Sequence, residues 1–337
     1  MPGTQTESGK AFEYACLMSI VDFLKDVSIK IVEDKPFITA RRSFDALNED
    51  VQLQMRLAAR AAIRMIYNLE PRLEHGSANS VLTLSIQPDS QGISGDVRDV
   101  VCVRSSDNWE IGLSCKHNHD AVKHCRLSDS IDFGEKWLQF PCSTTYFDEI
   151  RPVFQQLSRL KSESSGRALW SSIDDKAATI YQPILKAFLK EFKRIVNAQN
   201  NAPANLIQYL IGKKDFYKVI TDDAHRITKI QAVNICGTLN RSFNGFHSIT
   251  SIPLLKLPDR VFHADFVSDS DNSIEIICNE GWNIRMRIHN ASSRIESSLK
   301  FDVRLIAMPS SIFTQMEPWS IVDGYKAKEY LDNTSWQ

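Results

Sequence analysis

GDVRDVVCVR at residues 95–104 and WEIGLSCK at residues 109–116 form the most informative stretch of the sequence. Both segments are rich in β-branched and apolar residues, which favour strands. The polar residues SSDN between them suit a tight turn. The stretch therefore predicts a β-hairpin whose first strand begins at Asp99 and whose second strand ends at Lys116.

The two ends of this hairpin bring an acid and a base together. Asp99 opens the first strand and Lys116 closes the second, so their side chains can converge. Hydrolysis of a phosphodiester at neutral pH needs a hard cation that activates water, and carboxylate oxygens hold such a cation. A nearby lysine can orient the attacking water or stabilise the charge on phosphorus. The pair therefore favours a metal-dependent phosphodiester hydrolase.

The sequence around the hairpin predicts a mixed fold. Apolar residues at helical spacing predict helices over residues 9–26 and 48–68, residues 80–87 alternate as a strand, and residues 146–212 are mostly helical. Six further strands are predicted at 216–221, 227–237, 260–267, 273–278, 282–289 and 299–307. Since the order is not a regular alternation of strand and helix, it predicts an α+β fold.

The composition is that of a soluble globular protein of one or two domains, with 337 residues, 43% hydrophobic and 24% charged. No apolar run approaches the roughly 20 residues that span a bilayer, and the start lacks a secretion signal. The seven cysteines form no CxxC pair, so reduced thiols in the cytoplasm are expected. The net charge of −1 leaves nucleic-acid binding open, because a neutral sum can hide a basic face.

The hairpin resembles the active site of the PD-(D/E)xK nucleases. Together with GKAFEYA at 9–15, EIGLSCKHNHDAVKHCRLS at 110–128 and RIHNASSRIESSLKF at 287–301, it resembles the HaeIII family of type II restriction endonucleases. The resemblance implies an enzyme that needs Mg²⁺ and cuts double-stranded DNA at the palindrome GGCC. It also implies a PD-(D/E)xK catalytic core over residues 1–150. A helical and then strand-rich DNA-recognition region over residues 151–337 would follow, or the two would form one continuous domain.

The resemblance also implies roles for individual residues. Asp99 matches the metal-binding acid and Lys116 the catalytic lysine. Ser114 stands where the motif normally has a second acid, and its hydroxyl is expected to face the site. The main-chain carbonyl of Cys115 is expected to be a further metal ligand.

Because a hydroxyl is a poor substitute for a carboxylate, the second acid must come from elsewhere. Glu13 is an acid on the apolar stripe of the helix over 9–26, and we favour it as a metal ligand. Glu110 is the weaker candidate, since an extended chain places its backbone roughly 13 Å from that of Ser114. Asp96 is interpreted as a turn residue before the hairpin rather than a ligand.

Two segments are candidates for contact with DNA. The first is His117, Asn118 and His119, followed by an expected helix that contains Lys123 and Arg126. Such side chains can meet phosphates or base edges. The alternative is a polar loop followed by a solvated basic helix.

The second candidate is the strand over 282–289, where apolar residues alternate with Asn283, Arg285, Arg287 and His289. Between residues 281 and 304 five Lys or Arg stand against two acids. Arginine on such a row suits phosphates and guanine edges. The following loop adds Asn290, Ser292, Ser293 and Arg294. An ordinary solvated strand face remains the alternative.

Two other functions stay open at the level of sequence. A decayed nuclease that only binds DNA would explain Ser114 in place of an acid. A cysteine hydrolase using Cys115 with His117 or His119 is disfavoured, since a thiol on a strand lacks the helix N-terminus or base that activates it. For a nuclease, a palindromic target suggests a homodimer, and a cognate methyltransferase is implied genetically rather than as a bound partner.

Overall fold

The computed structural model describes residues 4–118, 122 and 125–319. The chain divides into two compact units, the first made of residues 1–120, 213–255 and 311–337 and the second of residues 121–212 and 256–310. These units differ from the predicted division at residue 150, because strands from the C-terminal half complete the sheet that contains the hairpin. None of the described helices has the length and apolar character needed to cross a membrane.

The first unit contains a seven-stranded mixed sheet in the order β1-β2-β3-β4-β6-β7-β12. Its strands are β1 (Ile29–Ile31), β2 (Leu82–Ile86), β3 (Val100–Arg104), β4 (Trp109–His117), β6 (Phe216–Asp222), β7 (Ile227–Val233) and β12 (Phe313–Pro318). The predicted hairpin is confirmed, with β3 and β4 antiparallel and Asn108 in the left-handed region at the turn. On its other side β4 pairs in parallel with β6, so β4 lies inside the sheet.

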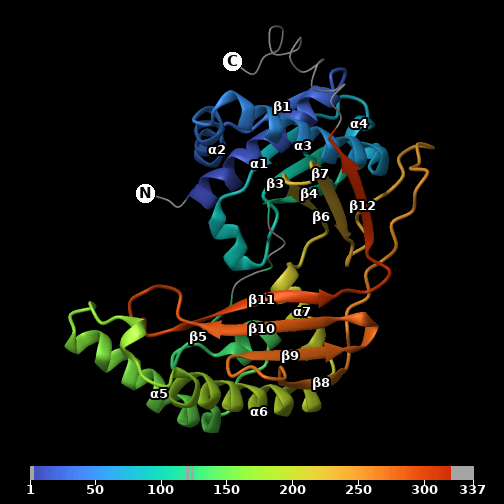
Figure 1. Cartoon of the computed structure of the whole chain (residues 1–337). Coiled ribbons are helices and arrows are strands. Elements are labelled where there is room, and N and C mark those ends of the chain that lie inside the picture. The colour runs from blue at the N-terminus through green and yellow to red at the C-terminus, as the bar shows by residue number, and fades with distance from the viewer. Residues whose placement is uncertain (1–3, 119–121, 123–124, 320–337) are drawn as a thin grey trace. The chain divides into compact units, whose positions relative to one another are not determined.

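Helices α1 (Thr4–Phe23), α2 (Lys35–Asp45), α3 (Glu49–Leu69) and α4 (Pro71–Glu74) gather beside this sheet (Figure 1). Their apolar residues share one core with Ile111, Leu113 and Cys115 of β4. Because side chains alternate along a strand, Ser114 and Lys116 belong to the opposite face of β4. The predicted helices over 9–26 and 48–68 are confirmed as α1 and α3, whereas α2 and β1 were not predicted.

The second unit contains an antiparallel sheet in the order β5-β11-β10-β9-β8. Its elements are β5 (Cys125–Leu127), β8 (Val261–Phe266), β9 (Ser273–Cys278), β10 (Asn283–His289), β11 (Leu299–Ala307), α5 (Thr144–Glu163), α6 (Gln182–Ala198) and α7 (Ala202–Ile211). Helices α5 and α6 lie along one side of the sheet (Figure 1), where Phe188 of α6 meets Phe301 of β11. The strands that follow residue 215 therefore belong to two different sheets.

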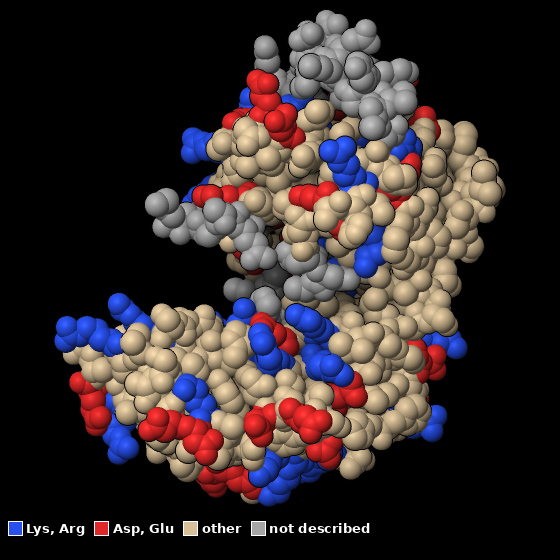
Figure 2. All heavy atoms as spheres, viewed as in Figure 1, with Lys and Arg blue, Asp and Glu red and all other residues tan. Residues whose placement is uncertain are grey.

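The strand prediction for 282–289 is confirmed in β10. Ile284, Met286 and Ile288 are fully buried, whereas Arg285 and Arg287 are exposed on the other face. The helix expected around Arg126 is wrong at that residue, because Arg126 lies in β5 and pairs with Lys300 of β11. On the face seen in Figure 2, Lys and Arg are interspersed with Asp and Glu, in agreement with the net charge of −1.

Candidate active site

Asp99 is fixed by both neighbouring strands. Its main-chain N–H donates to the carbonyl of Leu113 at 2.7 Å, and its carbonyl accepts from the N–H of Gln87 at 2.8 Å. Its carboxylate Oδ2 accepts from the N–H of Cys115 at 2.7 Å. The backbone thus holds the Asp99 carboxylate over β4.

The structure brings the predicted catalytic side chains together around this carboxylate. Lys116 Nζ and Ser114 Oγ each lie 3.4 Å from Asp99 Oδ2. Ser114 is buried, whereas Asp99 and Lys116 keep 23% and 22% of their side-chain surface exposed. A substrate in solution can therefore reach the acid and the lysine but not the serine.

Glu13 of α1 belongs to the same cluster. Its side chain is 8% exposed and forms an ion pair with Lys10 at 3.0 Å. Burial, together with the negative charge of Asp99, raises the pKa of Glu13 to about 8, and Lys10 opposes this shift. A buried carboxyl whose pKa is raised by a second carboxylate lies in a site that attracts a cation.

Lys10 is a member of the cluster that the sequence did not single out. Its Nζ lies 3.0 Å from Glu13 Oε2 and 2.6 Å from Asp89 Oδ1. Burial would lower the pKa of Lys10, but the two acids more than compensate and raise it. The signal was present in GKAFEYA, where Lys10 and Glu13 are one helical turn apart.

The donor set suits a hard cation that keeps part of its water. Among residues 4–118, 122 and 125–319 no three His, Cys, Asp or Glu side chains gather closely enough to hold a metal ion. Asp99 and Glu13 supply two carboxylates. Because the N–H and C=O of one residue in a strand point to the same side, the Cys115 carbonyl points to the side of Asp99. One or two carboxylates plus water is the usual environment of Mg²⁺ in proteins.

The thiol of Cys115 is not placed for nucleophilic attack. It is buried on the helix side of β4, and its interaction with Cys16 together with burial raises its pKa well above the ordinary value. His117 directs Nε2 to Asp223 at 2.9 Å. These contacts argue against the cysteine hydrolase.

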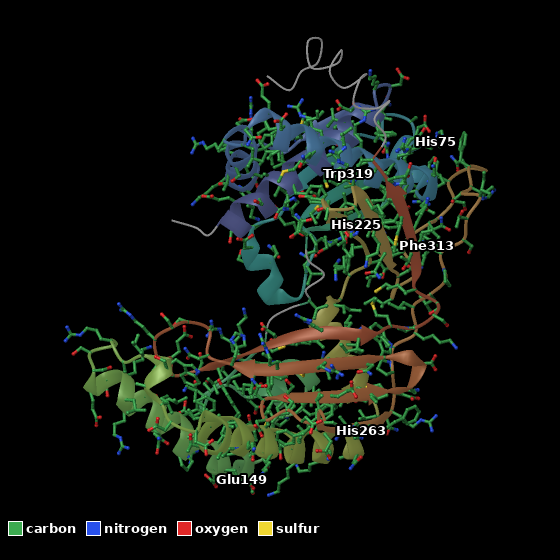
Figure 3. The ribbon with its side chains drawn as sticks, in the orientation of Figure 1. His75, Glu149, His225, His263, Phe313 and Trp319 are labelled. Atoms are coloured by element: carbon green, nitrogen blue, oxygen red, sulfur yellow. The ribbon has the colours of Figure 1, made fainter. Side chains whose placement is uncertain are left out.

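His117 and Asn118 are engaged with the turn after β6. Asn118 donates through Nδ2 to Asp223 Oδ2 at 2.8 Å and accepts through Oδ1 from the N–H of Asp223 at 3.0 Å. The same turn contains His225, labelled in Figure 3, whose Nδ1 lies 2.7 Å from Asp222. Contact between DNA and Asn118 would compete with these bonds. His119 and Lys123 lie outside the described residues.

The predicted basic residues of the second unit are paired with acids across strands. Arg285 contacts Glu275 of β9 at 3.0 Å, and Arg287 contacts Asp302 of β11 at 2.7 Å. His289 Nε2 also lies 3.1 Å from Asp302. These exposed pairs hold the arginines on one face of the sheet. At the neighbouring edge, Arg126 contacts Glu296 at 3.0 Å.

Asn290 stabilises the loop that follows β10. Its side chain is buried, donates to the carbonyls of Ser292 and Arg294, and accepts from the N–H of Glu296. Ser292 Oγ bonds to the backbone of Arg294, and the Ser293 carbonyl accepts from the N–H of Trp170. Asn290 therefore shapes the loop from inside, while Ser292, Ser293 and Arg294 are exposed at its surface.

Comparison with known proteins identifies the family of this chain. Residues 9–309 match the model of the HaeIII restriction endonuclease family. The chain is 39% identical over 321 residues to the type II restriction enzyme HaeIII of Haemophilus aegyptius, which covers 95% of this chain and 99% of that protein. No solved structure matches. The chain therefore belongs to the HaeIII family of type II restriction endonucleases.

Proposed function

We propose that this protein is a Mg²⁺-dependent endonuclease that cleaves double-stranded DNA at a short palindrome, with a PD-(D/E)xK active site in its first unit. The observation that supports the proposal most is the hydrogen bond from Cys115 to Asp99, which holds a carboxylate beside Lys116 and Glu13. The target GGCC follows from the resemblance to the HaeIII family.

Each residue of the site has its own role in the proposed reaction. Asp99, Glu13 and the carbonyl of Cys115 would hold Mg²⁺, which, when bound, lowers the pKa of water and neutralises charge on the phosphate. Lys116 places its partly exposed ammonium 3.4 Å from Asp99 Oδ2, where it can hold the attacking water or a non-bridging phosphate oxygen. Ser114 donates to Asp99 and keeps its carboxylate turned toward the site.

This assignment explains the missing acid of the motif. The second carboxylate would come from Glu13 on α1 instead of position 114 on β4, because Asp99 acts on Glu13 through its charge and the Ser114 hydroxyl donates to Asp99. The competing proposal is a nuclease that has lost its activity and only binds DNA. Ser114 in place of an acid favours this alternative. The buried Glu13 beside Asp99 argues against decay, since an acid with no role is costly to keep in such a place.

For recognition we propose the exposed face of the sheet in the second unit. Arg285 and Arg287 stand two residues apart on β10, about 6.8 Å in an extended strand, which matches about two base-pair steps of B-DNA. His289, Ser292, Ser293 and Arg294 continue this surface. His117, Asn118, His119, Lys123 and Arg126 remain proposed contacts, and Asn290 would act through the loop it shapes. A two-fold dimer would suit a palindromic site.

The test is incubation of the purified protein with unmethylated phage DNA in Mg²⁺ or in EDTA, followed by electrophoresis and mapping of the ends. Discrete fragments that need Mg²⁺ support the proposal, and their termini test GGCC. Intact DNA in Mg²⁺ despite measurable binding would contradict cleavage and favour the decayed protein. Cleavage that persists in EDTA would contradict the metal-dependent mechanism.

A further inference from the structure

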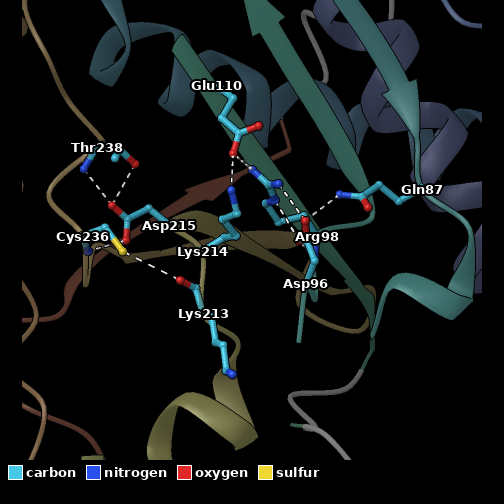
Figure 4. Close-up of polar contacts among 9 residues, drawn as sticks. All are labelled: Gln87, Asp96, Arg98, Glu110, Lys213, Lys214, Asp215, Cys236 and Thr238. Carbon is cyan, nitrogen blue, oxygen red and sulfur yellow. Dashed lines mark hydrogen bonds and ion pairs between the residues drawn. The ribbon is translucent and has the colours of Figure 1, made fainter. Parts of the chain in front are cut away.

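Arg98 is a buried arginine next to the candidate metal ligand Asp99. Its side chain is 5% exposed. Its Nε and Nη2 donate to the two carboxylate oxygens of Asp96 at 2.8 and 2.7 Å, and its Nη1 lies 3.2 Å from Glu110 on β4 (Figure 4). Such a fork-shaped pair fixes direction as well as distance.

The contacts continue into two more strands of the sheet. Gln87, which follows β2, donates to Asp96 at 3.1 Å, and Lys214, which precedes β6, donates to Glu110 at 2.9 Å (Figure 4). The charges of the two basic side chains, Arg98 and Lys214, are therefore balanced by those of the two acids that they contact. With the arginine buried and its fork occupied, the cluster is suited to holding four strands rather than to binding phosphate.

Gly112 shows how closely Arg98 lies on β4. A Cβ built on Gly112 would stand 2.1 Å from Cδ of Arg98 and 2.8 Å from its Cβ. Since these atoms are near the root of the side chain, Arg98 cannot move aside without moving its own backbone. Only glycine allows the arginine to cross β4 at this point, two residues before Ser114.

We propose that Asp96, Arg98 and Glu110 form a brace, in which Arg98 is a positioning residue for Asp99. The brace fixes the distance between the backbone at residue 98 and β4. The hydrogen bond from the N–H of Cys115 then fixes the position of the carboxylate of Asp99, the next residue. This inference rests on the proposed role of Asp99 as a metal ligand. Asp96 and Glu110 act in the brace and are not ligands themselves.

The experiment compares Arg98→Met, Arg98→Ala and Gly112→Ala with wild type in the full-length protein. We expect the cleavage rate at saturating DNA to fall by about 10- to 100-fold, the loss typical of groups that orient a metal ligand. We expect the Kd for DNA in EDTA to change by less than about twofold. Isothermal titration with Mg²⁺ alone should show affinity weakened by about the same factor as the rate.

Two comparisons separate positioning from general destabilisation. Arg98→Ala removes the Cγ and Cδ atoms that a Cβ on residue 112 would meet at 2.6 and 2.1 Å, and leaves only the Cβ contact at 2.8 Å. Adding Gly112→Ala should therefore cost less in Arg98→Ala than it does in wild type. The control is Arg104→Met, which removes the buried arginine at the other end of β3, where it bonds to the carbonyls of Arg72 and Leu73. It should lower the melting temperature without lowering the rate per folded molecule.

Three outcomes would overturn the brace. They are unchanged Mg²⁺ affinity in Arg98→Met, additive losses in the double variant, or an equal loss of rate in Arg104→Met. Weaker DNA binding with an unchanged rate would instead make Arg98 a phosphate contact. If wild type does not cleave, the proposed function fails, whereas Mg²⁺ titration still decides whether Arg98 positions Asp99.

Discussion

The N–H of Cys115 donates to the carboxylate of Asp99 at 2.7 Å, and this bond links a main-chain group of β4 to the residue that precedes β3. The bond satisfies one carboxylate oxygen from the plane of the sheet. Lys116 Nζ approaches the same oxygen, Oδ2, at 3.4 Å, and the negative charge of Asp99 acts on Glu13. The backbone therefore fixes the position of the Asp99 carboxylate before any ligand arrives.

Replacing Asp99 should separate binding from cleavage. Asp99→Asn can keep the hydrogen bond from Cys115 through its amide oxygen but loses the charge that holds Mg²⁺. We expect cleavage to fall by more than about a hundredfold, the scale of losing one preorganised charged group. Gel-shift binding in EDTA should stay within about twofold of wild type. Cleavage at the wild-type rate would exclude Asp99 as a ligand.

Lys116 and Ser114 should differ sharply in their effect on rate. Lys116→Met removes the partly exposed ammonium beside Asp99, and we expect a loss of more than about a hundredfold in single-turnover cleavage. Ser114→Ala removes one long hydrogen bond at 3.4 Å, so we expect less than about tenfold. Both variants should melt close to wild type. Equal losses would mean that the Ser114 hydroxyl takes part directly in metal binding.

Local signals explain what the sequence could predict of the fold. The hairpin of β3 and β4 was predictable because its strands are neighbours joined by a short polar turn. The pairing of β4 with β6 was not, since a parallel partner about a hundred residues later leaves no local trace. The edge strands β1 and β5 have only three residues each, and they form because a neighbouring strand offers hydrogen bonds.

The same reasoning explains which residues of the site could be predicted from the sequence. Glu13 stood out as an acid on an apolar helical stripe, and the structure buries it beside Asp99. Lys10 did not, because a lysine one turn from an acid is common on exposed helices. The brace of Arg98 was also invisible, since its contact with Glu110 depends on the register of β3 against β4.

The titration of Glu13 gives a prediction for pH. Its pKa is raised from 4.5 to about 8, so between these values the folded protein without metal keeps a proton that the unfolded chain releases. The free energy of unfolding in EDTA therefore decreases as pH rises from about 5 to 8. Glu13→Gln should flatten this slope and raise the melting temperature at pH 8 by about 2 °C or more.

The affinity for Mg²⁺ should change with pH in the direction opposite to the free energy of unfolding. Mg²⁺ must displace the proton of Glu13, so its apparent affinity for wild type should increase from pH 6 to pH 8. In Glu13→Gln the affinity should be weaker by more than about tenfold and should lose this dependence. Calorimetric titration with Mg²⁺ at pH 6 and pH 8 measures this affinity. An unchanged Mg²⁺ affinity in the variant would show that the second ligand is another residue.

The cross-strand pair of Arg285 and Glu275 tests the recognition surface. Arg285→Ala should weaken DNA binding by about 1–3 kcal/mol. If Arg285 meets phosphate, all sequences weaken alike and the salt slope falls by about 1; if it reads guanine, only the target weakens. Glu275→Gln releases the arginine held at 3.0 Å and should strengthen binding to unrelated DNA.

Arg151 on α5 provides the matched control for this surface. It is an exposed arginine paired with Asp148 at 2.8 Å, on the helical side of the same unit. Arg151→Ala should leave the Kd and its salt dependence unchanged, which fluorescence anisotropy with labelled duplexes can measure from about 50 to 200 mM salt. If Arg285→Ala behaves like Arg151→Ala, the exposed face of β10 is an ordinary solvated strand, and the DNA contacts must be sought on another surface.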